Sequence, residues 1–153
     1  KIIEEIKLNG KDQGGVSTFN IGSIDEVYKR IITCLANNET RIVDFHSSVS
    51  DATLTPLDVQ DVKYIRVTNL DDANSLTLSL QIDVGEDDTA ADESASILLG
   101  AGQSFIMGTP HDGIAVHDSS AAVLNTLVDL ESIVIDPIGN DVKIEIFVAS
   151  VVA

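Results

Sequence analysis

Apolar and polar residues alternate along several stretches of this chain, and that alternation constrains the fold more than any other sequence feature. From Leu76 to Ile82, reading Leu-Thr-Leu-Ser-Leu-Gln-Ile, every second residue is apolar. Successive side chains of a strand point to opposite faces, so the pattern predicts a β-strand with one face on a core and the other in water. Residues rich in β-branched side chains predict further strands at 142–149, 64–68, 133–135 and 41–45, and weaker ones at 2–8 and 16–21.

The segments between these stretches are rich in residues that favour turns. Asn9-Gly10, Asp71 to Asn74, Gly100-Ala101-Gly102 and Gly139-Asn140-Asp141 each separate two apolar stretches. Short turns of this composition join antiparallel neighbours. The segment around Gly100 and Gly102 is expected to form either a hairpin or a bend in one continuous strand.

Residues 24–36 break the β pattern. Apolar residues fall at Ile24, Val27, Tyr28, Ile31, Ile32 and Leu35, which is helical spacing, and Ser23 with Glu26 matches a capping box. We expect a short helix here. The alternative is a strand from Tyr28 to Leu35, favoured by its β-branched residues and followed by a turn at Asn37-Asn38. A second helical turn or two could lie within 121–130.

About eight strands and at most one or two short helices predict an all-β fold, an antiparallel β-sandwich or jelly roll. Residues 1–153 contain no internal repeat and no linker, so we expect a single domain, in which residues 1–15 form an N-terminal arm or an edge strand. The long stretches without alternation, 47–61, 84–94 and 108–120, are expected to be exposed loops.

The net charge of −16 excludes some classes of function. Phosphate binding needs a cationic surface, so no nucleic-acid partner is expected, and an anionic membrane would repel the chain. The charge is uneven: residues 1–66 carry eight cations against ten acids, while residues 67–153 carry only Lys143 against fifteen. Self-association is therefore expected to use the first part. No apolar run reaches the roughly 18 residues of a membrane span, and we expect a soluble protein made in the cytosol.

The residues do not form a recognisable catalytic or cofactor site. His111-Asp112 and His117-Asp118 form the most site-like pair, but only His46 could join them, which is fewer ligands than metal-dependent hydrolases need. The acidic run at 86–93 lacks the register of a calcium loop. Cys34, the one cysteine, is flanked by apolar residues and is expected to be a buried, inert thiol. We expect no enzyme activity, no cofactor and no metal.

One layout combines three segments: the strand from Tyr64 to Leu70, the alternating strand 76–82, and Ile97 to Phe105 with its Gly100-Ala101-Gly102-Gln103-Ser104 turn. Together these segments resemble small β-sandwich virion proteins of tailed bacteriophages, particularly those of marine bacteria. The ending, 130–133 with 142–149, looks like the closing hairpin of the same group. The likeness covers about half of the chain and concerns a sandwich core and its turns, so no functional residue carries over.

The resemblance implies a capsid decoration (cement) protein on the outside of a phage head. Such a protein would bind the major capsid protein as a homo-oligomer, with a trimer favoured, and would be localised in the virion. Under this hypothesis the less acidic first part faces the capsid or a sister subunit. The candidate partner-binding residues are Ile2, Ile3, Ile6, Lys7, Lys11, Arg30 and Arg41. An apolar N-terminal strand at a sheet edge is suited to strand addition to a partner.

Two other classes of function remain open. One is another virion part with the same fold, a tail, adaptor or fibre-associated protein, which differs in its copy number. The other is a non-viral module that binds Ca²⁺ or a polymer through its acidic loops. A rise in melting temperature on adding Ca²⁺ at constant ionic strength would favour this module.

Overall fold

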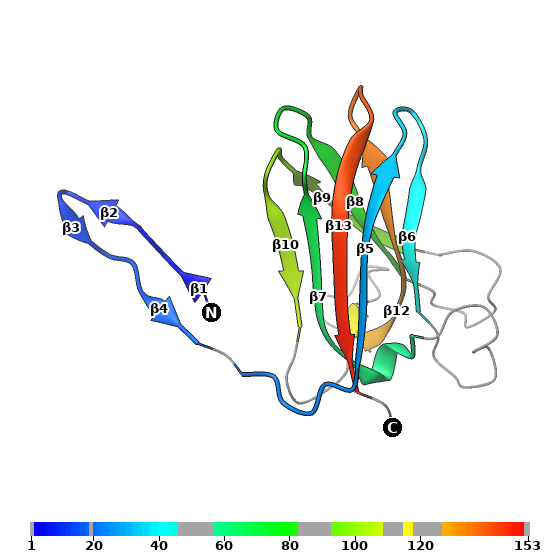
Figure 1. Cartoon of the computed structure of the whole chain (residues 1–153), viewed down its shortest axis with the longest axis horizontal. Coiled ribbons are helices and arrows are strands. Elements are labelled where there is room, and N and C mark those ends of the chain that lie inside the picture. The colour runs from blue at the N-terminus through cyan, green and yellow to red at the C-terminus, as the bar shows by residue number, and fades with distance from the viewer. Residues whose placement is uncertain are drawn as a thin grey trace.

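The computed structural model describes residues 2–18, 20–45, 57–82, 93–108, 115–117 and 127–151. Two antiparallel sheets form a sandwich, and a separate N-terminal segment projects from it (Figure 1). The first sheet has the order β10 (Ser104–Met107), β7 (Val62–Asn69), β13 (Val142–Ser150) and β5 (Glu26–Cys34). The second has the order β9 (Glu93–Leu99), β8 (Leu76–Ile82) and β12 (Leu127–Pro137), and both β6 (Thr40–Asp44) and β11 (Ala115–His117) pair with β12.

The strand pairing is nested in the manner of a jelly roll. The first long strand of the sandwich pairs with the last, β5 with β13, and the next ones inward are β6 with β12, β7 with β10 and β8 with β9. All these pairs are antiparallel, and they place eight strands four to a layer, with β11 added to the second layer, which is the jelly-roll arrangement. The predicted all-β sandwich or jelly roll is confirmed. The described helical structure is one 3-10 turn, Val59–Asp61, capped by Asp58, whose Oδ1 accepts a hydrogen bond of 2.9 Å from the backbone N–H of Gln60.

The core lies between the sheets and follows the alternation in the sequence. On β13 the residues at alternate positions, Ile144, Ile146 and Val148, are fully buried, while Lys143 is exposed. The alternate leucines Leu76 and Leu78 of β8 face them from the second sheet, together with Ile133 and Ile135 of β12. At roughly 25 cal/mol per Å² of apolar surface, this burial is the main stabilising contribution to the fold.

The expected helix over 24–36 is wrong: residues 26–34 form strand β5. It pairs with β13 over nine residues, from Val142 opposite Cys34 to Ser150 opposite Glu26. Ser23 has a φ of 57°, in the left-handed region, whereas an N-cap residue adopts extended backbone, so the capping box does not form. The alternative strand is the correct one. For the possible helical turns at 121–130, residues 121–126 lie outside the described residues and 127–130 belong to β12.

The turn at 100–103 joins strands of different sheets. Strand β9 before it pairs with β8, and β10 after it pairs with β7, so the expected hairpin between them does not form. Gly102 has a φ of 68°, and the backbone N–H of Gln103 donates to the carbonyl of Gly100 at 3.2 Å. The chain crosses from one layer of the sandwich to the other here, which is closer to the alternative of a bent strand.

Residues 2–17 form a hairpin that lies apart from the sandwich (Figure 1). Its four short strands are β1 (Ile2–Ile3), β2 (Lys7–Leu8), β3 (Lys11–Asp12) and β4 (Val16–Ser17). β1 pairs with β4 and β2 with β3. We call residues 2–18 the arm. The sequence predicted an arm or edge strand over 1–15, and the structure shows a hairpin, because the chain turns back at Asn9-Gly10.

Candidate partner-binding surface

The arm is held together by a tight turn and by backbone hydrogen bonds. Asn9 and Gly10 have φ values of 50° and 75°, which fits a two-residue turn with both central residues left-handed. The N–H of Glu4 donates to the carbonyl of Gly15 at 2.9 Å, and that of Gln13 donates to the carbonyl of Ile6 at 2.7 Å. The two limbs are therefore connected along most of their length.

Gly14 permits the closest approach of the two limbs. A Cβ atom at this position would overlap the backbone oxygen of Glu4, whereas a Cβ atom at the neighbouring Gly15 would meet nothing within 4 Å. The N–H of Gly14 also donates to Oδ1 of Asp12 at 2.8 Å. Only glycine fits at position 14 without moving the opposite limb.

The arm exposes large apolar side chains that no part of the sandwich covers. The exposed fractions are 58% for Ile3, 55% for Ile6, 62% for Leu8 and 65% for Val16. Lys7 and Lys11, which flank the turn, are exposed as well. An isolated two-stranded hairpin is marginally stable in water, so an arm of this composition is suited to binding against another surface. The structure thus places Ile2, Ile3, Ile6, Lys7 and Lys11 together on one projecting element.

The other two candidate residues lie on the sandwich, in different sheets. Arg30 is on β5, the strand that follows the arm, and its guanidinium lies 5.1 Å from the ring centroid of Tyr28. Arg41 is on β6 of the second sheet. It forms ion pairs with Asp44 at 2.9 Å and Glu131 at 3.5 Å. The structure brings Arg41 together with these acids rather than with the arm.

The outer face of the first sheet carries a charged and aromatic cluster that the sequence analysis missed. Glu145 on β13 accepts from Lys29 at 3.1 Å and also from Arg66. Arg66 lies 5.6 Å from the ring centroid of Phe147, and Phe147 meets Tyr64 edge to face at 6.0 Å. The hydrogen bond from Lys29 and then that from Arg66 hold the pKa of Glu145 below its usual range, against the opposing effect of desolvation. Alternation places these residues outward, but their proximity depends on β5–β13–β7 pairing, which local patterns do not reveal.

Exposed apolar side chains border this cluster. Val27 and Ile31 of β5 are 52% and 64% exposed, and Ile106 of β10 is 52% exposed. The face therefore combines balanced charge with uncovered apolar surface, unlike the strongly acidic remainder of the chain.

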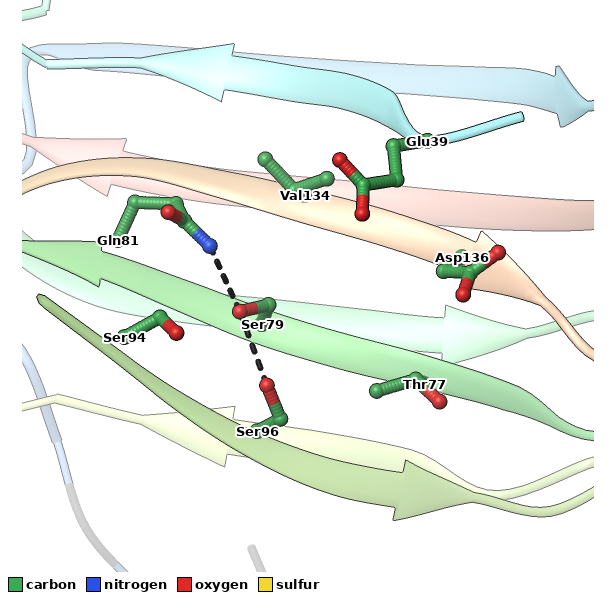
Figure 2. Close-up of a pocket in the computed structure, with 8 residues that line it drawn as sticks. All are labelled: Glu39, Thr77, Ser79, Gln81, Ser94, Ser96, Val134 and Asp136. Atoms are coloured by element: carbon green, nitrogen blue, oxygen red, sulfur yellow. Dashed lines mark hydrogen bonds between the residues drawn. The ribbon is translucent and has the colours of Figure 1, made fainter. Parts of the chain in front are cut away.

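The outer face of the second sheet holds a shallow polar hollow of about 400 Å³ (Figure 2). Hydroxyl and amide side chains line its floor, where Nε2 of Gln81 donates to Oγ of Ser79 at 2.7 Å and Oγ of Ser96 donates to the same atom at 3.0 Å. Glu39, just before β6, and Asp136 of β12 contribute carboxylates to the lining (Figure 2). The lining contains no histidine, cysteine or cation that could act with these carboxylates as a nucleophile and base pair.

The remaining candidates from the sequence are only partly within the described residues. His46, the pair His111-Asp112 and the acidic run 86–92 lie outside them, and of His117 only the backbone, in β11, is described. Cys34 is buried as expected, and desolvation raises the pKa of its thiol, with a smaller opposing effect of a hydrogen bond from Thr40. Within the described ranges, no three His, Cys, Asp or Glu side chains are grouped so as to hold a metal ion. Within the same ranges, no helix has the length and apolarity needed to cross a membrane.

Comparisons with known proteins give little further information. No protein-family model matches the chain, and no curated protein matches it. Among solved structures, the chain is similar to one described as "Bacillus endospore appendages form a novel family of disulfide-linked pili", with 10% identity and a TM-score of 0.39. The alignment covers 91% of this chain and 99% of that chain.

Proposed function

We propose that this protein is a capsid decoration protein, which binds the outside of a phage head as an oligomer and stabilises the shell without catalysing a reaction. Its partners would be the major capsid protein and further copies of itself. The arm is its attachment element, and the sandwich is the body that covers the joint between shell subunits.

The exposed apolar arm is the observation that carries this proposal. Ile3, Ile6, Leu8 and Val16 are each more than half exposed on a hairpin that stands away from the sandwich (Figure 1). A hairpin gains stability when a partner covers such a surface, because burial removes the apolar area from water. A protein whose most prominent feature is an uncovered hairpin is best explained as part of an assembly.

The fold and the charge support the same role. Jelly rolls are common among viral capsid domains, although the fold alone does not determine a function. The net charge of −16 keeps the free protein soluble and confines contacts to the less acidic surfaces, namely the arm and the first sheet. Binding across a joint between shell subunits favours the assembled state by the binding free energy of each copy. Summed over many copies, this would resist outward pressure from packaged DNA.

Deleting residues 1–8 tests the attachment role. We expect the variant to keep a folded sandwich, because the core residues all belong to 34–148, but to lose most of its occupancy on particles. Occupancy is measured as copies per purified particle after incubation with decoration-free heads, and folding by the thermal melting curve. Unchanged occupancy of a folded variant would refute the role of the arm.

Copy number separates this function from the other virion roles. A decoration protein is expected in numbers that match the sites of an icosahedral shell, whereas the number of copies of a tail, adaptor or fibre-associated protein follows the symmetry of the tail and is independent of the number of shell sites. Quantitative mass spectrometry of purified particles, with the major capsid protein as internal standard, gives the ratio. A calcium- or polymer-binding module would be absent from particles altogether.

A further inference from the structure

Strand β5 is an open edge of the first sheet. It lies at the end of the order β10-β7-β13-β5, and β13 is its hydrogen-bonded neighbour among the described strands. The edge is nine residues long, from Glu26 to Cys34. An edge strand leaves N–H and C=O groups unpaired on its outer side, so it can accept a further strand.

The sequence of β5 complements residues 2–7, the first limb of the arm, when the two segments are aligned antiparallel. In the register that places Ile3 opposite Ile31, Glu4 falls opposite Arg30 and Glu5 opposite Lys29. The next position places Ile6 opposite Tyr28. Two adjacent acids thus meet two adjacent cations, and apolar residues flank them on both sides. We infer that residues 2–7 of one copy add to the β5 edge of a second copy.

The surroundings of the two cations suit this pairing. The side chain of Lys29 is 54% exposed although it reaches Glu145, and Arg30 is exposed, with its guanidinium 5.1 Å from the ring centroid of Tyr28. Ile31 is 64% exposed, and Ile3 is 58% exposed in the arm. Opposite charges and apolar pairs directly across an antiparallel ladder stabilise the pairing beyond the backbone hydrogen bonds.

Charge disfavours one symmetric alternative, in which two β5 edges pair antiparallel about Arg30, because Arg30 of one copy would then lie directly opposite Arg30 of the other. The arm offers Glu4 and Glu5 at the same place. In the structure the arm extends away from the β5 strand of its own chain, in a position to reach a neighbour (Figure 1). Residues 2–7 can pair with β5 of the second copy and still stay paired with the other limb of their own hairpin, because a strand has two hydrogen-bonding edges.

This inference deepens the proposed function, on which it rests, by naming the partner of the arm. A contact between the arm of one copy and the edge of the next is heterologous, so it closes into a ring when the rotation between copies permits. In a ring of two copies, each copy would place its arm on the β5 edge of the other. A trimer is the smallest ring without such a mutual exchange.

Mixing two variants that each carry one introduced cysteine, both in a chain with the native Cys34 replaced by alanine, tests the register directly. One chain carries Ile3→Cys and the other carries Ile31→Cys, and the mixture is exposed to mild oxidation. Antiparallel partners have Cα atoms about 4.5–5.5 Å apart, within reach of a disulfide. We expect a covalent heterodimer to form about tenfold or more faster than with the control Val27→Cys, because residue 27 lies on the same face of β5 but about 13 Å further along the strand. Equal rates for the two mixtures would overturn the register, and no heterodimer in either would overturn the pairing.

A charge exchange provides an independent test in solution. Glu4→Arg and Arg30→Glu are each expected to reduce self-association at least about tenfold in sedimentation experiments, and the double variant to regain most of it. The control double variant, Glu5→Arg with Arg30→Glu, is expected to stay dissociated, since these two residues are not opposite each other in the proposed register. Rescue by the control instead of the first pair would show that the register is shifted.

A failure of the arm–β5 pairing can be distinguished from a failure of the proposed function. If the arm binds only the shell, the cysteine mixtures give no heterodimer, while deletion of residues 1–8 still removes the protein from particles. In that case the pairing is wrong and the proposed function stands. If the heterodimer forms but the protein is absent from particles, the pairing stands and the function is wrong.

Discussion

Asn69 is a fully buried polar residue at the point where strands of both sheets end together. Its Nδ2 donates to the carbonyls of Asn74 at 2.8 Å and Gly100 at 3.1 Å, and its Oδ1 accepts from the N–H of Asp71 at 3.0 Å. These bonds satisfy backbone groups of the two turns that leave β7 and β9. A buried polar group of this kind costs stability unless all its partners are present.

Replacing Asn69 by alanine is expected to cost about 2–3 kcal/mol of unfolding free energy, because several buried backbone groups lose their partners at once. Equilibrium unfolding in urea measures the loss. Asn140→Ala is the matched control, since its amide makes one exposed hydrogen bond, to Oδ1 of Asn74 at 3.0 Å, and its loss is expected to cost less than about 1 kcal/mol. Equal losses for the two variants would contradict the role assigned to Asn69.

Two carboxylates link stability to pH. The hydrogen bonds from the N–H groups of Ala73 and Asn74 hold the pKa of Asp71 below its usual range, and Lys29 and Arg66 do so for Glu145. A lowered pKa in the folded state gives stability that is fully present above the ordinary values, about 3.9 for Asp and 4.3 for Glu, and is lost as the pH falls through the folded values.

The variant Glu145→Gln is therefore expected to melt at a lower temperature than the wild type near pH 7 and to approach it as the pH falls toward about 3. Melting curves at constant ionic strength across this range give the comparison. A difference between the two proteins that does not change with pH would show that the ion pairs of Glu145 add nothing to stability.

At the scale of elements, how well the sequence predicts a strand depends on how many faces of that strand are buried. The alternating residues 76–82 coincide with β8, and 142–149 lie within β13, because both strands have one buried and one outward face. Strand β5 is an edge strand with Val27 and Ile31 outward and exposed, so its apolar residues do not alternate and happen to follow helical spacing. Its strand character comes from pairing with β13, more than a hundred residues away, which no local pattern contains.

The sequence predicted the candidate partner-binding surface only in part, as it did the strands. An apolar segment near the N-terminus and the Asn9-Gly10 turn are visible in the sequence, and the structure shows both in one hairpin. The separation of Arg41 from the arm, and the cluster of Lys29, Arg66 and Glu145, depend on which strands become neighbours. Long-range pairing is the information that the sequence patterns lack.

Gly14→Ala is expected to disrupt the arm without affecting the sandwich, because the added Cβ atom would overlap the backbone of Glu4. The expected result is a loss of particle binding at an unchanged melting temperature. Gly15→Ala, which adds the same atom in open space, is expected to bind normally. Normal binding by both variants would mean that attachment does not need a folded hairpin.

At the scale of the whole molecule, two parts that differ in structure are joined in one chain. The sandwich has nested strand pairing and a core of large apolar residues. The arm is open, apolar and nearly balanced in charge, on a chain whose net charge of −16 otherwise keeps copies apart. Under the proposed function, we expect contacts with other molecules at the arm and at the β5 edge of the first sheet.

Imaging the native assembly by electron microscopy tests the central claim most directly. The account predicts density for the jelly roll on the outer surface of a phage head, repeated over the shell, with each hairpin arm reaching from its own sandwich to a neighbouring molecule. A protein found free of any particle, as a monomer whose arm touches no other molecule, would contradict it.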